Sequence, residues 1–388
     1  MSTHKQIFLF IPAIVCFSMA MGIQDSVLNN YFNDVFHLTA GQRGFLELPR
    51  EFPGFMVVLM AGALAVLAVT HLAMASTLIC AVGTVGIVLV GPHYAPMLGM
   101  LMVSSAGMHL LMPATASIAL GLSDESKRGR GLGRLGAVET FGAMMGSSLI
   151  WVFFSASGTR YEAAFLIAAT MAACAAALYA CMHIPHLHQR RARLVIRRKY
   201  WLYYLLESLF GARKQIFITF GFWVLVDVYG QEARGIAQLL FTASCIGLFF
   251  KPTVGLIIDR FGERTVMIAD GLLLSVVCVG YGYAMHFTAD AEQALWVARI
   301  CFVCDNLLFS LGTGRAVYLS RVADTPQDLT STLAMGVSVN HVASMTIPMI
   351  AGKAWEIYGY ERVFLAAAVL ALTASAAASL VPRRKTAQ

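Results

Sequence analysis

The chain is poor in charged residues. Asp, Glu, Lys and Arg make up 13% of its 388 residues, whereas soluble domains carry about 25%. From Phe52 through Ser123 no such residue occurs. One bilayer crossing needs about 20 apolar residues, so this run is long enough for several crossings. The composition therefore excludes a soluble globular protein and predicts an integral membrane protein.

The chain also lacks the motifs of several function classes. It has no P-loop, which argues against transport driven by ATP hydrolysis. Hydrolase motifs such as G-x-S-x-G and H-E-x-x-H are missing, so no enzyme activity is expected. Its eight cysteines fall almost entirely in apolar segments, and the pair Cys301 and Cys304 has no second pair beside it. We expect no metal site and no cofactor.

The hydropathy pattern predicts an all-α protein with twelve membrane-spanning helices. Short links that carry Gly, Pro or charge separate most of these segments. The predicted crossings lie near 7–31, 42–66, 72–91, 95–119, 131–155, 161–182, 200–229, 234–257, 265–286, 294–318, 328–354 and 361–381.

The one long link, 183–199, carries six Lys and Arg residues and divides the chain into two sets of six helices. We expect an N-terminal bundle over 1–182, a cytoplasmic linker over 183–199 and a C-terminal bundle over 200–388. Seventeen Lys and Arg lie on the side of this linker and four on the other. By the positive-inside rule both termini lie in the cytoplasm, which predicts a multi-pass protein of the cytoplasmic (inner) membrane.

The net charge of +7 comes mostly from the Lys and Arg residues on the cytoplasmic side. We expect the basic side to meet anionic membrane lipid, and we expect no nucleic acid among the partners.

Residues 255–264 read GLIIDRFGER and join two predicted crossings. This loop resembles the signature of the major facilitator superfamily, and it follows the eighth crossing, where that family carries it. The resemblance implies two pseudo-symmetric six-helix bundles and a gating role for the motif residues. A second copy after the second crossing is degenerate, because Val66 stands where the intact copy has an Asp. The expected gating residues are Gly255, Asp259, Arg260, Gly262 and Arg264.

Charges inside predicted crossings are the candidates for function, because such residues are costly in a bilayer. The second crossing opens with Glu47, Arg50 and Glu51, and the seventh carries Glu207 followed by adjacent cations. The resemblance implies that helices 1, 4, 7 and 10 line a central cavity. An ion-pair cluster that only fixes helix packing is the alternative. The predicted substrate-binding residues are Arg50, Arg213, Lys214, Glu207, Asp305 and Asn340.

Three residues are candidates for proton coupling, which needs a group that gains and loses a proton during transport. Glu51 shares a helix with Arg50, so substrate binding to Arg50 would favour its protonation. Glu139 and His341 occupy matching depths in the two sequence repeats. Lys251 and Arg315 are expected to pair with the loop motif, and His109 to make an internal hydrogen bond.

These observations predict a secondary transporter that works by alternating access and moves a small organic, anionic solute with protons or another coupling ion. The protein is expected to be a monomer. One alternative is a copper-type transporter, since Met56 and Met60, Met108 and Met112, and Met345 and Met349 put thioethers on one helix face. Drug or metabolite efflux and a non-transporting receptor are the others. The helix-5 antiporter motif is incomplete, because no Pro follows its glycines Gly136, Gly142 and Gly146.

Overall fold

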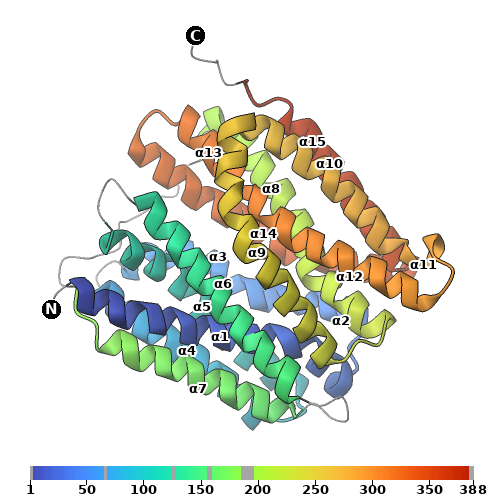
Figure 1. The fold of residues 1–388 in the computed structure, drawn as a ribbon, viewed down its shortest axis with the longest axis horizontal. Helices are drawn as coiled ribbons and strands as arrows, with labels where there is room; N and C mark the ends of the chain where they lie inside the picture. The colour runs from blue at the N-terminus through green and yellow to red at the C-terminus, as the bar shows by residue number, and fades with distance from the viewer. Residues whose placement is uncertain (1–2, 65–67, 124–127, 155–159, 185–195, 384–388) are drawn as a thin grey trace. The chain divides into compact units, whose positions relative to one another are not determined.

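The computed structural model describes residues 3–64, 68–123, 128–154, 160–184 and 196–383 (Figure 1). Within these residues the regular elements are helices, and eleven spans are long and apolar enough to cross a membrane. They match eleven of the twelve predicted crossings. The twelfth is α3, Glu47–Leu64, whose 18 residues include three charges, Glu47, Arg50 and Glu51.

The helices have the following bounds: α1 Thr3–Phe36, α2 Ala40–Phe45, α3 Glu47–Leu64, α4 Val69–Leu89, α5 Tyr94–Gly121, α6 Arg128–Phe153, α7 Tyr161–Ala180, α8 Trp201–Ile216, α9 Ala233–Phe261, α10 Glu263–Gly282, α11 Ala284–Phe287, α12 Ala291–Leu308, α13 Thr313–Val322, α14 Pro326–Tyr358 and α15 Tyr360–Ala378. Short 3-10 or π segments follow α8 and α12, and another precedes α8.

The chain forms two compact units. Unit 1 comprises Met1–His37, Pro49–Arg191 and Gln231–Leu248. Unit 2 comprises Leu38–Leu48, Ala192–Gly230 and Phe249–Gln388. Each unit therefore contains a short segment from the other half of the sequence. Most of the predicted linker 183–199 lies outside the described residues, so the division into bundles at that linker stays a prediction.

Unit 1 is built around α1 and α4. Helix α1 packs against α6 and α7, and α4 packs against α5 and α7 (Figure 1). At one end of α1 the ring of Tyr31 meets Phe36, Tyr161 and Phe165 with centroid distances of 5.1 to 5.5 Å. Edge-to-face contacts of this kind stabilise helix packing beyond the area they bury.

The close approach of α1 and α6 depends on glycine. A Cβ atom added to Gly142 would lie 2.7 Å from Ser18 Cβ and 2.8 Å from the Val15 carbonyl oxygen, whereas one added to Gly136 would meet no atom within 4 Å. We expect Gly142→Ala to lower the free energy of unfolding by about 1–3 kcal/mol through overpacking. Gly136→Ala is the matched control and should be neutral or stabilising. Apparent melting temperatures of the two purified variants check this, and equal values would contradict it.

Unit 2 is built around α8. Helix α8 packs against α14 and α15, and α10 packs against α15 and α12. The span that begins with α8 is the most buried of the eleven described spans. It continues as two π-helical segments, Phe217–Gly221 and Val224–Val228. Wider turns of this kind are frequently found at functional sites.

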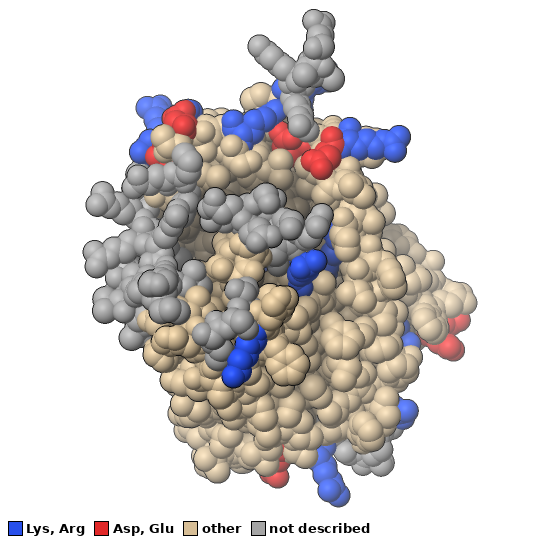
Figure 2. Space-filling view, turned by 60° about the vertical axis from the view of Figure 1, so that its left-hand side comes forward, with Lys and Arg blue, Asp and Glu red and all other residues tan. Residues whose placement is uncertain are grey.

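Apolar side chains cover much of the outer surface. On α10, Leu272, Leu273 and Val276 are exposed while Leu274 and Cys278 on the opposite face are buried. On the face shown in Figure 2 the charged side chains gather mainly at the upper edge, and other residue types form most of the surface below. This is the surface that a multi-pass membrane protein needs, because lipid replaces water around its spans.

Candidate functional site

Arg213 lies at the centre of a buried cluster in unit 2. Its Nη1 atom donates a hydrogen bond to Asp305 Oδ1 of α12 at 3.3 Å, and its Nη2 atom lies 3.7 Å from Asp270 Oδ1 of α10. Arg213 is 2% exposed. Three helices of unit 2 therefore meet at one guanidinium, with a carboxylate on either side.

A second ion pair continues this cluster along α8. Arg315 of α13 donates from Nε to Glu207 Oε1 at 2.8 Å. The guanidinium carbons of Arg315 and Arg213 lie 3.4 and 5.5 Å from the centroid of the Phe210 ring. Cation–π attraction to this ring adds to the ion pairs. The expectation that Arg315 pairs with the loop motif is therefore wrong, because Glu207 on the neighbouring helix is the nearer carboxylate.

Lys214 contacts a different helix from Arg213. Its Nζ atom donates to Asn340 Oδ1 of α14 at 3.1 Å. The two side chains diverge because consecutive residues on a helix point about 100° apart. Gly211, one turn earlier, allows this approach, since a Cβ atom there would lie 3.0 Å from the Asn340 carbonyl oxygen.

The fully buried carboxylate of Glu47 connects the segment Leu38–Leu48 to α8 of unit 2. Arg43 Nη1 donates to Glu47 Oε1 at 2.6 Å, and Gln215 Nε2 of α8 donates to Glu47 Oε2 at 2.9 Å. Arg43 is 3% exposed and Glu47 is 0% exposed. Near the other end of this segment, Thr39 Oγ1 donates to Glu356 Oε1 of α14 at 2.6 Å.

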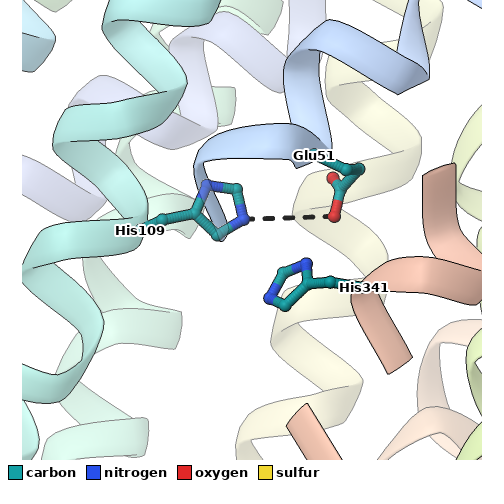
Figure 3. A group of neighbouring side chains, drawn as sticks. All are labelled: Glu51, His109 and His341. Carbon is teal, nitrogen blue, oxygen red and sulfur yellow. Dashed lines mark ion pairs between the residues drawn. The ribbon is translucent and has the colours of Figure 1, made fainter. Parts of the chain in front are cut away.

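Unit 1 holds a smaller charged cluster near the start of α3. Glu51 lies 3.2 Å from Arg50 Nη2 and 4.0 Å from His109 Nε2 of α5. Figure 3 shows the Glu51 and His109 side chains pointing toward one another. The other ring nitrogen of His109 is 3.1 Å from Ser105 Oγ, and Ser105 donates to the Arg50 carbonyl oxygen. The predicted internal hydrogen bond of His109 is confirmed.

The two remaining coupling candidates are Glu139 and His341. Glu139 is exposed on α6 of unit 1, and His341 is half-buried on α14 of unit 2. Asp25 of α1 is exposed and within electrostatic reach of Arg50.

The loop motif joins α9 to α10 through a single residue. Gly262 has φ +79°, a conformation that favours glycine. Asp259 and Arg260 are exposed, and Arg260 lies over the Phe261 ring at 5.4 Å. Gly255 is also exposed and Arg264 half-buried. Among the described residues Asp259 has no ion pair, so the gating role of the motif stays a prediction. The degenerate copy at Val66 lies outside the described residues.

The family of the chain follows from comparison with known proteins. The sequence profile of the Major Facilitator Superfamily matches residues 10–332, which is most of the chain. The chain belongs to the major facilitator superfamily. This membership indicates a transporter rather than an enzyme. No curated protein matches the sequence significantly.

Solved structures of this superfamily share the fold over almost the full length. A nucleoside transporter, NupG (D323A mutant), has a TM-score of 0.76 at 14% identity, covering 97% of this chain and 100% of that chain. A D-xylose-proton symporter has a TM-score of 0.74 at 14% identity, covering 98% of both chains. A peptide-bound transporter of the POT family has a TM-score of 0.77 at 10% identity, covering 96% of this chain and 95% of that chain. At these identities the likeness shows the fold alone.

Sequence reasoning about this transporter missed several residues of the clusters. Asp270 is the main one, and the rule that flagged Asp305 could have found it, because it is a lone carboxylate within the predicted crossing 265–286. Gln215 and Ser105 carried no signal, since uncharged polar residues are common in spanning helices. Glu263, at the end of the loop motif, is buried and lies 2.8 Å from Arg321 of α13.

The methionine pairs give the copper alternative little support. Met345 is 8% exposed and Met112 is 61% exposed. The Met60 side chain lies outside the described residues. A buried Met such as Met345 fits the role of a gap-filler between helices.

Proposed function

We propose that this protein is a proton-coupled transporter that moves a small organic solute across the cytoplasmic membrane by alternating access. The binding site of such a carrier opens to each side of the membrane in turn. The observation that supports proton coupling most directly is the position of Glu51. Its carboxylate lies between Arg50 of α3 and His109 of α5, so a proton gained or lost there changes its attraction to both groups.

Fewer observations support an anionic charge on the solute than support proton coupling. Arg50 and Arg213 each lie beside a carboxylate, which removes these two guanidiniums from the argument for an anionic solute. The proposed substrate class is therefore a small organic solute, and anionic charge is a secondary hypothesis for binding tests. In the orientation given by the Lys and Arg asymmetry, both termini face the cytoplasm.

The first experiment identifies the solute. Purified protein is screened by thermal shift against organic anions, organic cations, neutral sugars, nucleosides and copper(I). A specific ligand raises the melting temperature by mass action. A stabilising metal and no stabilising organic compound would favour the copper alternative.

The coupling prediction is tested with that solute in vesicles. We expect the parent protein to concentrate the solute when a pH gradient is imposed, and Glu51→Gln to equilibrate it without concentrating it. The amide keeps the shape of the carboxyl group but cannot carry a proton. Glu292→Gln, at an exposed position of α12, is the matched control and should behave like the parent. Gradient-driven accumulation by Glu51→Gln equal to that of the parent would refute the role of Glu51.

A further inference from the structure

The buried cluster around Arg213 has more carboxylates than guanidiniums. Arg213 faces Asp270 and Asp305, while Arg315 is paired with Glu207. Arg213 and Arg315 both act electrostatically on Asp270. With every group ionised these five side chains carry a net charge of −1. An excess charge in a buried site is costly, because the protein interior solvates it poorly.

The hydrogen bonds of this cluster are incomplete at one point. Arg213 Nη2 and Asp270 Oδ1 are both buried, and neither has a hydrogen-bond partner among the described residues. Their separation of 3.7 Å is too long for a direct hydrogen bond. Leaving buried polar atoms unsatisfied costs about 1–3 kcal/mol each.

A small cavity lies where these unsatisfied atoms meet. Its volume is ≈ 30 Å³, and its charged lining residues are Arg213, Asp270 and Arg315. Phe210 and three alanines of α15 are among its apolar lining residues. A cavity of this size with several polar partners can hold a water molecule. A water molecule there could bridge Arg213 to Asp270 and bring a proton to the carboxylate.

The geometry distinguishes the two carboxylates. Asp305 accepts a hydrogen bond from Arg213 and does not line the cavity, whereas Asp270 lines the cavity and accepts no such bond at Oδ1. A metal cation would be repelled by the Arg213 guanidinium at the same place. A proton on Asp270 avoids this repulsion, because it leaves a neutral carboxyl group whose O–H can donate to a water molecule in the cavity.

We infer that Asp270 is a second proton-binding site, separate from Glu51, which takes one proton from water in the Arg213 cavity. The proton moves from a cavity water, itself resupplied from bulk water, to a carboxylate oxygen of Asp270, and the net charge of the cluster changes from −1 to zero. Arg213 is then held by Asp305 alone. When Asp270 loses this proton, Arg213 is attracted to both Asp270 and Asp305. The attraction between α8 and α10 is therefore stronger in the deprotonated state than in the protonated state.

The charged and titratable groups around this site are few. Helix α8 contributes Glu207 and Arg213, α12 contributes Asp305, and α13 contributes Arg315. On α10 itself Cys278 is within electrostatic reach of Arg213, and the cavity residues of α15 are uncharged. The inference rests on the proposed function only for the use of the proton in transport. Proton uptake itself is a property of the cluster.

The test measures protonation directly. Full-length protein in lipid nanodiscs is titrated with pH while infrared difference spectra record the C=O stretching band of protonated carboxyl groups. We expect the parent to show a band that disappears as the pH rises, and Asp270→Asn to lose that component. Asp290→Asn is the matched control, because Asp290 caps α12 at an exposed site and Asn is an equally good cap.

The results separate this inference from the Glu51 proposal. If Asp270→Asn keeps the same band as the parent, the inference is wrong, whatever Glu51→Gln does in vesicles. If Asp270→Asn loses the component while Glu51→Gln still responds to a pH gradient, the Glu51 role fails and the inference stands. Asp270→Asn leaves Arg213 paired with Asp305, so this variant should fold. Its melting temperature verifies that.

Discussion

Arg213→Gln is expected to produce the largest loss of stability and transport among single substitutions in unit 2. It leaves Asp305 and Asp270 without their shared guanidinium. Removing one partner of a buried ion pair costs about 3–5 kcal/mol, because an uncompensated charge stays in the interior. We expect a strongly lowered melting temperature and no solute accumulation in vesicles.

The controls for this prediction separate charge from shape. Arg213→Gln combined with Asp305→Asn removes one charge of each sign and should recover much of the lost stability. Arg213→Lys keeps the charge but lacks the planar fork that reaches two carboxylates, so its stability should lie between those of the parent and Arg213→Gln. Arg362→Gln, at an exposed position of α15, should resemble the parent. A melting temperature of Arg213→Gln equal to that of Arg362→Gln would contradict the prediction.

Arg43→Met should be the second most damaging change. It removes the guanidinium that lies 2.6 Å from the Glu47 carboxylate, which is 0% exposed. The expected loss is again about 3–5 kcal/mol. Arg43 and Glu47 belong to the same short segment, Leu38–Leu48, so the two opposite charges of the pair cancel within that segment. The hydrogen bond from Gln215 joins this pair to α8.

A double substitution tests that interpretation. Arg43→Met with Glu47→Gln removes both charges and keeps an oxygen that can accept from Gln215, so stability should return close to that of the parent. Neutral replacements of buried ion pairs are often tolerated in this way. If the double variant melts as low as Arg43→Met alone, the cost of Arg43→Met comes from lost packing rather than from a stranded charge.

The sequence alone predicted the twelve-helix architecture closely. Apolar runs must span the bilayer as helices, because no water is present there to satisfy backbone groups. Local patterns such as the Gly262 turn and the divergence of Arg213 from Lys214 were also predictable, since they depend only on helix geometry and on the conformational freedom of glycine.

The pairing of charges was decided by the tertiary structure. The spacing of residues along a helix shows which side chains share a face, but it does not show which other helix meets that face. Sequence reasoning therefore placed Arg213 toward a solute and Arg315 toward the loop motif. The role of Arg213 toward a solute stays a prediction. In the folded chain Arg315 pairs with Glu207 and Arg213 pairs with Asp305, because ion pairs form between whichever charges packing brings within reach.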